Sequence, residues 1–168
     1  FFGADPQDIF LRPNVTEVLN EFILGVALPR DAEIAITDLE YGAIANLVRF
    51  RCRRDGLSER IVRLPGWSKE ILSLTADSLV ETILSQLGPS TRMLVCSDIM
   101  TANGLVIPIE KLARETRRRG IFLVVDGAHG PGSLELDFRK LDQVDFYGGN
   151  LHKWMLGPEG NGVLYVRR

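Results

Sequence analysis

The stretch Ile121-Phe-Leu-Val-Val-Asp126-Gly-Ala-His129 decides the fold. Its first five residues are all apolar, and the earlier run Met93-Leu-Val-Cys96 has the same continuous pattern. Strands buried on both faces have such runs, whereas strands with one solvated face alternate between apolar and polar residues. Segments of helical periodicity separate the runs. The sequence therefore predicts an α/β fold, a three-layer αβα sandwich around a mostly parallel sheet of about seven strands.

Strand and helix patterns alternate along the whole chain. Strands are predicted at Ile9–Leu11, Glu33–Thr37, Arg60–Leu64, Met93–Ser97, Phe122–Asp126, Val144–Tyr147 and Gly162–Val166. Helices are predicted at Val15–Val26, Tyr41–Arg53, Leu79–Leu87 and Ile109–Arg119. Asn14 or Thr16 would cap the first helix, and Gly88 and Gly120 would follow the ends of the last two.

The composition is that of an ordinary globular protein, with 168 residues, 45% hydrophobic residues and 25% charged residues. A net charge of −2 gives no reason to expect nucleic acid or a membrane surface as partner. Cys52 and Cys96 have neither metal-binding spacing nor a disulfide framework, so we expect a reducing cytoplasm. Because the chain begins at Phe1 without Met and stops just after the last predicted strand, we expect an N-terminal segment and a C-terminal small domain to be absent.

Polar residues follow four of the predicted strands. They are Thr37-Asp38 with Glu40-Tyr41, Ser97-Asp98, Asp126 with His129, and Asn150 with His152-Lys153. Ligands bind at the carboxyl ends of strands in open parallel sheets, so these residues predict a site. The sequence lacks the P-loop pattern, and no G-x-G-x-x-G follows the first strand. The sequence therefore excludes a P-loop and argues against a classical dinucleotide-binding fold.

Two strand ends carry residues that suit a specific chemistry. A buried carboxylate such as Asp126 can keep a pyridine nitrogen protonated, which makes the ring an electron sink; alternatively, Asp126 only caps the following turn. Lys153 can act as a nucleophile that forms a Schiff base, or it is a solvated surface lysine. The pair His152-Lys153 and the glycine-rich turn that follows favour the chemical interpretation when they are taken together with Asp126.

The order of these motifs resembles the class V aminotransferase family of fold type I pyridoxal-phosphate enzymes. The resemblance rests on Asp126-Gly-Ala-His129, Asn150-Leu-His-Lys153-Trp154 and Gly157-Pro-Glu-Gly160-Asn-Gly162-Val-Leu-Tyr-Val166. Nearer the start, Asn14-Val-Thr-Glu17 is similar to the family's phosphate-binding turn, and Asp38-Leu-Glu-Tyr41-Gly-Ala43 to the segment whose ring stacks on the cofactor. The family includes cysteine desulfurases, related carbon–sulfur lyases and isopenicillin N epimerase-like proteins. Asn150 and Trp154 make the chain more similar to the epimerase-like branch.

The resemblance implies that residues 1–168 form the pyridoxal-phosphate-binding large domain of an enzyme that acts on an amino acid. Lys153 would form a Schiff base with the cofactor, Asp126 would pair with its ring nitrogen, and His129 would lie near its phenolic oxygen. The other residues with implied cofactor contacts are Val15, Thr16 and Glu17 in the phosphate-binding turn, Asn150 and His152 at the phosphate, Tyr41 over the ring, and Asp98 beside it. A homodimer is also implied.

Two alternatives to this function remain open from the sequence. Asp126, His129 and His152 could form a metal site with two imidazoles and one carboxylate. The chain could also be a noncatalytic scaffold that keeps the fold without the cofactor. Within the family, the sequence does not choose among epimerisation, transamination and cleavage of a bond to sulfur, because pyridoxal phosphate supports all of them.

Overall fold

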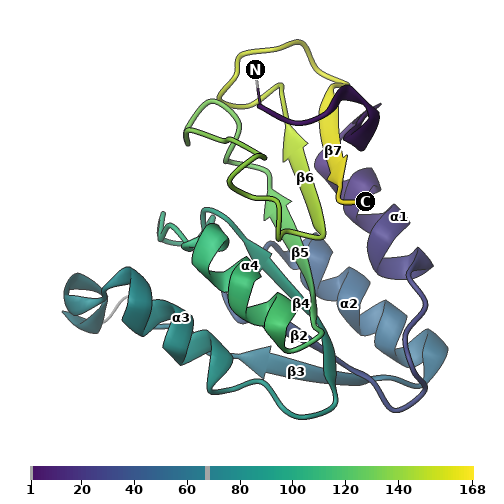
Figure 1. Ribbon diagram of the computed structural model, residues 1–168, viewed down its shortest axis with the longest axis vertical. Helices are drawn as coiled ribbons and strands as arrows, with labels where there is room; N and C mark the ends of the chain where they lie inside the picture. Colours follow the sequence, from purple (N-terminus) through teal and green to yellow (C-terminus); the bar gives the residue numbers. More distant parts are fainter. Residues whose placement is uncertain (1, 67–68) are drawn as a thin grey trace.

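The computed structural model describes residues 2–66 and 69–168, and these contain a sheet of seven strands (Figure 1). The strands are β1 (Ile9–Arg12), β2 (Glu33–Thr37), β3 (Ser58–Val62), β4 (Thr91–Ser97), β5 (Phe122–Gly127), β6 (Phe146–Asn150) and β7 (Gly162–Val166). Their order across the sheet is β1-β7-β6-β5-β4-β2-β3. All pairs from β6 to β3 are parallel, whereas β7 is antiparallel to both of its neighbours. The mostly parallel sheet predicted from the sequence is confirmed.

Helices cover both faces of the sheet, which makes the predicted three layers (Figure 1). The helices are α1 (Val15–Gly25), α2 (Gly42–Asp55), α3 (Ala76–Leu84) and α4 (Ile109–Arg118), with short 3-10 helices at Pro6–Asp8 and Lys69–Ser73. Apolar residues of α1 and α2 pack on one face, and those of α3 and α4 pack on the other. None of the helices in the described part of the chain is long and apolar enough to cross a bilayer.

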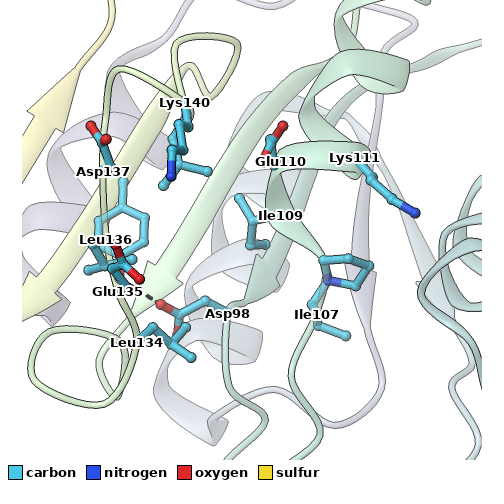
Figure 2. A pocket seen from close by; sticks show the side chains of 13 residues that line it. Asp98, Ile107, Ile109, Glu110, Lys111, Leu134, Glu135, Leu136, Asp137 and Lys140 are labelled. Atoms are coloured by element: carbon cyan, nitrogen blue, oxygen red, sulfur yellow. Dashed lines mark hydrogen bonds between the residues drawn. The ribbon is translucent and has the colours of Figure 1, made fainter.

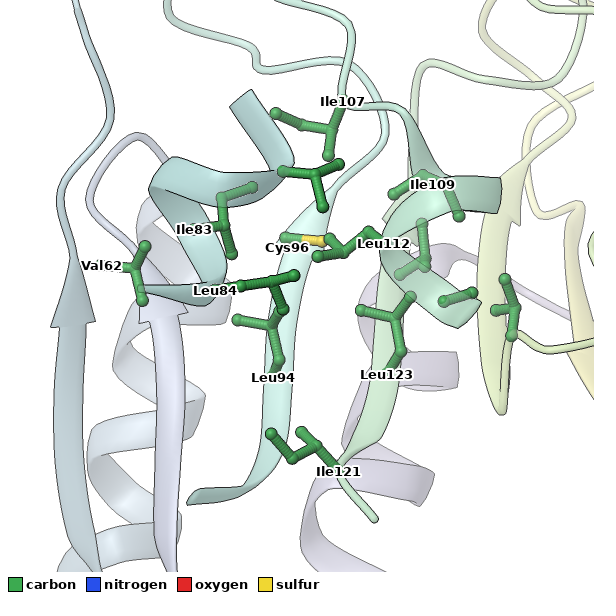
Figure 3. Close-up of a cluster of buried hydrophobic side chains, with 14 of the residues drawn as sticks. Val62, Ile83, Leu84, Leu94, Cys96, Ile107, Ile109, Leu112, Ile121 and Leu123 are labelled. Carbon is green, nitrogen blue, oxygen red and sulfur yellow. The ribbon is translucent and has the colours of Figure 1, made fainter. Parts of the chain in front are cut away.

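Side chains of β4 contribute to both hydrophobic cores, one on each face of the sheet. Met93 and Val95 pack toward α1 and α2, whereas Leu94 and Cys96 point to α3 and α4 (Figure 3). All four are fully buried. Each large apolar side chain buried in this way contributes about 1.5–3 kcal/mol. Burial on both faces explains why residues 93–96 include no polar side chain.

Strand β6 differs from its predicted bounds. The apolar pattern predicted Val144–Tyr147, but the strand is Phe146–Asn150 and includes Gly148. Glycine weakens a strand in general, so pattern alone did not extend the strand this far. Here the glycine is needed because a Cβ at Gly148 would lie 2.6 Å from Cγ1 of Val18 in α1. The close approach brings the first turn of α1 to the end of β6.

The prediction for α3 was wrong at both ends. The helix runs from Ala76 to Leu84 because Thr75 and Ser78 form a capping box that starts it earlier than expected. It ends with Ser85 as the C-cap, so Gly88 does not terminate it. Gly120 does follow α4 with a left-handed φ of 66°, as predicted.

Candidate active site

A cavity of about 330 Å³ lies at the carboxyl edge of the sheet, beside the start of α1. That volume is within the range of roughly 300–1,000 Å³ for small-molecule sites. Its lining includes eight of the predicted site residues: Val15, Thr16, Tyr41, Asp126, His129, Asn150, His152 and Lys153. Asn14, Thr101 and Ala128 complete the lining. Segments far apart in sequence therefore meet at the edge where the sequence predicted a site.

The first turn of α1 is fixed by two asparagines. Asn14 is the N-cap, and its side chain accepts a hydrogen bond from the Glu17 amide at 3.0 Å. Asn150, which is buried at the end of β6, accepts from the Val15 amide at 3.0 Å through Oδ1. Within residues 2–66 and 69–168, nothing accepts from the Thr16 amide. This amide and the Thr16 hydroxyl stand at a positive helix end, where anions bind.

His152 has a polar atom that needs a partner. Its Nδ1 is buried, and no group in the described part of the chain forms a hydrogen bond with it. Leaving a buried polar atom unpaired costs about 1–3 kcal/mol. Because His152 lines the same cavity as Thr16, an anionic ligand held at the start of α1 can satisfy this nitrogen. The residues present thus fit a phosphate-bearing ligand.

Asp126, the next-to-last residue of β5, is a buried carboxylate that faces the cavity. Burial raises its pKa to about 6, and the hydrogen bond from the Ala128 amide (2.9 Å) and the charge of Lys153 oppose that rise. The group is therefore mostly ionised at neutral pH. A desolvated carboxylate of this kind suits a protonated ring nitrogen.

His129 lies at the centre of a hydrogen-bonded group. Its Nε2 is 3.4 Å from Nζ of Lys153 and 3.2 Å from Oγ1 of Thr101. Its Nδ1 accepts a hydrogen bond from the indole Nε1 of Trp154 at 3.0 Å. Burial lowers the pKa of His129, and the positive charge of Lys153 makes a smaller contribution in the same direction. The Schiff-base lysine implied by the family resemblance is thus in direct contact with a neutral imidazole.

Thr101 is a cavity residue that the sequence analysis did not select. It lies in the loop after β4, which is held by a bridge between Ile99 and Val106 and by a hydrogen bond from the Met100 amide to the Leu105 carbonyl. A loop of this kind has no periodic signal. Its position directly after the polar end of a buried strand was the available clue.

Two of the predicted contact residues, Glu17 and Asp98, do not line this cavity. Glu17 is exposed, although its amide is part of the capping of α1. Tyr41, by contrast, lines the cavity with its side chain 57% exposed, just before α2 begins. The aromatic ring therefore borders the opening of the cavity and does not belong to the hydrophobic core.

Asp98 lies on the opposite face of the sheet, in a second cavity of about 370 Å³ beside α4. Figure 2 shows it between Leu134 and Leu136 on one side and Ile107 and Ile109 on the other. The hydroxyl of Tyr147 donates to Oδ2 of Asp98 at 2.6 Å, and the backbone amide of Ile99 donates to Oδ1 of Asp98 at 2.7 Å. Burial raises the Asp98 pKa to about 7. The structure therefore does not support the predicted contact between Asp98 and a ligand of the first cavity.

The family model named aminotransferase class-V matches residues 1–168. The chain belongs to the class V aminotransferase family. It is 37% identical to isopenicillin N epimerase of Streptomyces clavuligerus, over 98% of this chain and 40% of that protein. It is 30% identical to a cysteine desulfurase of Stutzerimonas stutzeri, over 99% of this chain and 39% of that protein. The chain thus spans about two-fifths of the length of the curated relatives it matches.

Solved structures of a carbon–sulfur lyase share the fold. The cystine C–S lyase C-DES, in complex with its reaction product cysteine persulfide, superposes with a TM-score of 0.86 at 31% identity. The match covers 99% of this chain and 43% of that one. A lysine-to-alanine variant of the lyase, with glycine covalently linked to its PLP cofactor, matches with a TM-score of 0.85 at 29% identity, over 99% of this chain and 42% of that one.

The metal-site hypothesis is not supported for this class V aminotransferase relative. Across residues 2–66 and 69–168, no three His, Cys, Asp or Glu side chains form a group that could hold a metal ion. Instead, Trp154, Thr101 and Lys153 lie around the His129 ring. His129 is therefore the centre of a hydrogen-bonded group that includes Lys153.

Proposed function

We propose that the protein containing this chain is a pyridoxal-phosphate-dependent enzyme that acts on an amino acid, and that residues 1–168 are its cofactor-binding domain. One observation carries the proposal. A single cavity contains the Lys153 amine, the buried Asp126 carboxylate and the unpaired Thr16 amide at a helix start. Membership of the class V family and the PLP cofactor of C-DES support it.

The residues of the cavity divide the work between binding and proton movement. When bound, pyridoxal phosphate supplies an electron sink for bond breaking at the substrate's α-carbon. Lys153 holds the cofactor covalently and moves a proton at that carbon. Asp126 keeps a proton on the ring nitrogen by accepting a hydrogen bond from it. Because the carboxylate is buried, this interaction is stronger than it would be in water.

Other residues of the cavity bind the phosphate and the ring of the cofactor. The Thr16 amide and hydroxyl bind the phosphate at the start of α1, and the unpaired Nδ1 of His152 completes this anion site. Asn150 contributes indirectly, since its side chain is already bonded to the Val15 amide and fixes the helix end. Tyr41, at the opening of the cavity, would provide an aromatic face for the ring.

Among the reactions open to the family, we favour epimerisation of an amino-acid centre. The isopenicillin N epimerases of Streptomyces clavuligerus and Amycolatopsis lactamdurans are each 37% identical to this chain, whereas the cysteine desulfurase of Stutzerimonas stutzeri is 30% identical. We also propose that the enzyme is a homodimer in the cytoplasm. The family resemblance supports the dimer, and two buried free cysteines are compatible with a reducing compartment.

Absorbance and isotope exchange test the proposal on the full-length protein. The purified protein should carry a cofactor absorbance band that Lys153→Ala removes and Lys140→Ala, in the second cavity, retains. Incubation in deuterium oxide should then exchange the α-proton of an amino-acid substrate. Release of sulfide from cysteine without α-epimerisation would favour lyase chemistry instead. If the protein shows neither the cofactor absorbance band nor exchange of the α-proton, it is a noncatalytic scaffold.

A further inference from the structure

The indole of Trp154 contacts the candidate site from outside the cavity lining. Its Nε1 donates to Nδ1 of His129 at 3.0 Å, although the side chain is 59% exposed. We propose that Trp154 is a positioning residue that holds His129 in the tautomer with its proton on Nε2, facing Lys153. The catalytic meaning of this contact rests on the proposed function, because Lys153 is the cofactor lysine in that proposal.

The tautomer follows from the donor properties of the two rings. An indole nitrogen can only donate a hydrogen bond. The nitrogen that receives this bond, Nδ1 of His129, must therefore be without a proton. A neutral imidazole carries one N–H, and which nitrogen bears it is set by the hydrogen bond made at the other. The proton of His129 is thus on Nε2.

The geometry of the pair shows that the N–H group is the important part of Trp154. The two ring centroids are 6.4 Å apart and the planes are inclined by 52°, so the rings meet at an edge and are not stacked. Replacing the indole by a phenyl ring would keep an aromatic side chain there and remove the donor. Because Trp154 is largely exposed, this replacement does not disturb the core.

The Nε2 proton determines what His129 can do for Lys153. Nε2 lies 3.4 Å from Nζ of Lys153 and 3.2 Å from the Thr101 hydroxyl. With its proton in place, Nε2 donates to the hydroxyl or to another oxygen in the cavity. It cannot accept a proton from the lysine ammonium. His129 is therefore a hydrogen-bond donor at this position, and proton movement is left to Lys153.

Trp154 also opposes charging of the imidazole. A protonated His129 would place a second N–H at Nδ1, directly against the indole donor. Burial and the Lys153 charge lower the pKa of His129 in the same direction. The titratable groups that line the cavity with His129 are Tyr41, Asp126, His152 and Lys153. The pKa of His129 should thus lie below the ordinary value for histidine, so the imidazole is neutral at neutral pH.

Nitrogen-15 spectra of the full-length holoenzyme, labelled at histidine, measure this tautomer directly. His129→Gln removes the His129 signals and so assigns them. The unaltered protein should show Nε2–H, with Nδ1 as an acceptor. Trp154→Phe should raise the ratio of the Nδ1–H to the Nε2–H form by about 2–10-fold, the effect of losing one hydrogen bond. The pKa of His129 should rise in the same variant.

A double-mutant cycle shows whether Trp154 acts through His129. Trp154→Phe should shift the pH titration of the cofactor absorbance in the unaltered enzyme and have no further effect when His129 is Gln. An unchanged tautomer ratio in Trp154→Phe, or an equal shift in both backgrounds, would overturn the proposal. If the protein carries no cofactor, the proposed function fails, but the histidine spectra still decide whether Trp154 fixes the tautomer.

Discussion

Asp126 and Asp98 lie at the ends of neighbouring parallel strands, and they face opposite sides of the sheet. Asp126 pairs in register with Ser97, the last residue of β4, so Asp98 is one position further along. Successive side chains of a strand alternate between faces. That single step places Asp126 in the cavity beside α1 and Asp98 in the cavity beside α4.

The two aspartates are similar in burial but differ in their partners. Burial raises both pKa values, to about 6 for Asp126 and about 7 for Asp98, and the cavity at Asp98 is slightly larger. Both oxygens of Asp98 accept hydrogen bonds from the protein, one of them from Tyr147. Asp126 instead shares its cavity with Lys153 and an unpaired helix start. The comparison teaches that cavity size and a shifted pKa do not locate a site, whereas complementary charges and unpaired donors do.

Asparagine at each position gives the largest expected contrast. In the full-length enzyme, Asp126→Asn should lower kcat/KM by about 1,000-fold, because a group acting on the reacting atoms contributes roughly 10²–10⁴-fold. Asp98→Asn should change kcat/KM by less than about 3-fold once folding is accounted for, because Asp98 lies in the second cavity and does not line the candidate site. Steady-state kinetics with both variants measure the ratio. Equal losses in the two variants would remove the distinction between the cavities.

The pH dependence of stability should reveal Asp98 where activity does not. Its pKa is raised from 3.8 to about 7 on folding, so its stabilising effect is complete below pH 3.8 and is lost as pH rises through about 7. The free energy of unfolding should therefore fall over this range by on the order of 4 kcal/mol from this group. Urea unfolding of the cofactor-free full-length protein at several pH values should show a smaller fall in Asp98→Asn. An identical pH profile in the variant would contradict the assignment.

A smaller effect should come from the contact between β6 and α1. Gly148→Ala would place a methyl group against Val18 and Val15, at 2.6 and 3.1 Å. Overpacking of this kind costs about 1–3 kcal/mol and should also weaken cofactor binding, because it displaces the anion-binding turn. Gly25→Ala is the matched control, since open space surrounds that position. Thermal unfolding and cofactor titration of both variants check the prediction, which fails if the two variants behave alike.

The sequence was sufficient for the fold and for the convergence of strand ends. Continuous apolar runs identify strands buried on both faces, and the carboxyl ends of parallel strands necessarily share one edge. The sequence alone therefore predicts that Asp126 and Lys153 lie close together. The structure brings both into one cavity with Thr16 and Tyr41.

What the sequence could not provide depends on register and loop geometry. The end of β4 at Ser97 was predicted correctly, but the face that Asp98 occupies depends on the register between β4 and β5, which the sequence does not give. Thr101 enters the cavity through a loop whose path is set by backbone hydrogen bonds. The unpaired Nδ1 of His152 and the contact of Trp154 with His129 depend on side-chain orientation. Composition and periodicity contain none of this information.

The covalent link at Lys153 is the most direct test of the central claim. Borohydride should reduce and fix the cofactor on the full-length holoenzyme, and peptide mass mapping then identifies the modified lysine. We expect the cofactor mass on the peptide containing Lys153, and not on peptides containing Lys111 or Lys140, which line the second cavity. Modification of a different lysine, or no modification in a protein that retains its cofactor absorbance, would contradict the account.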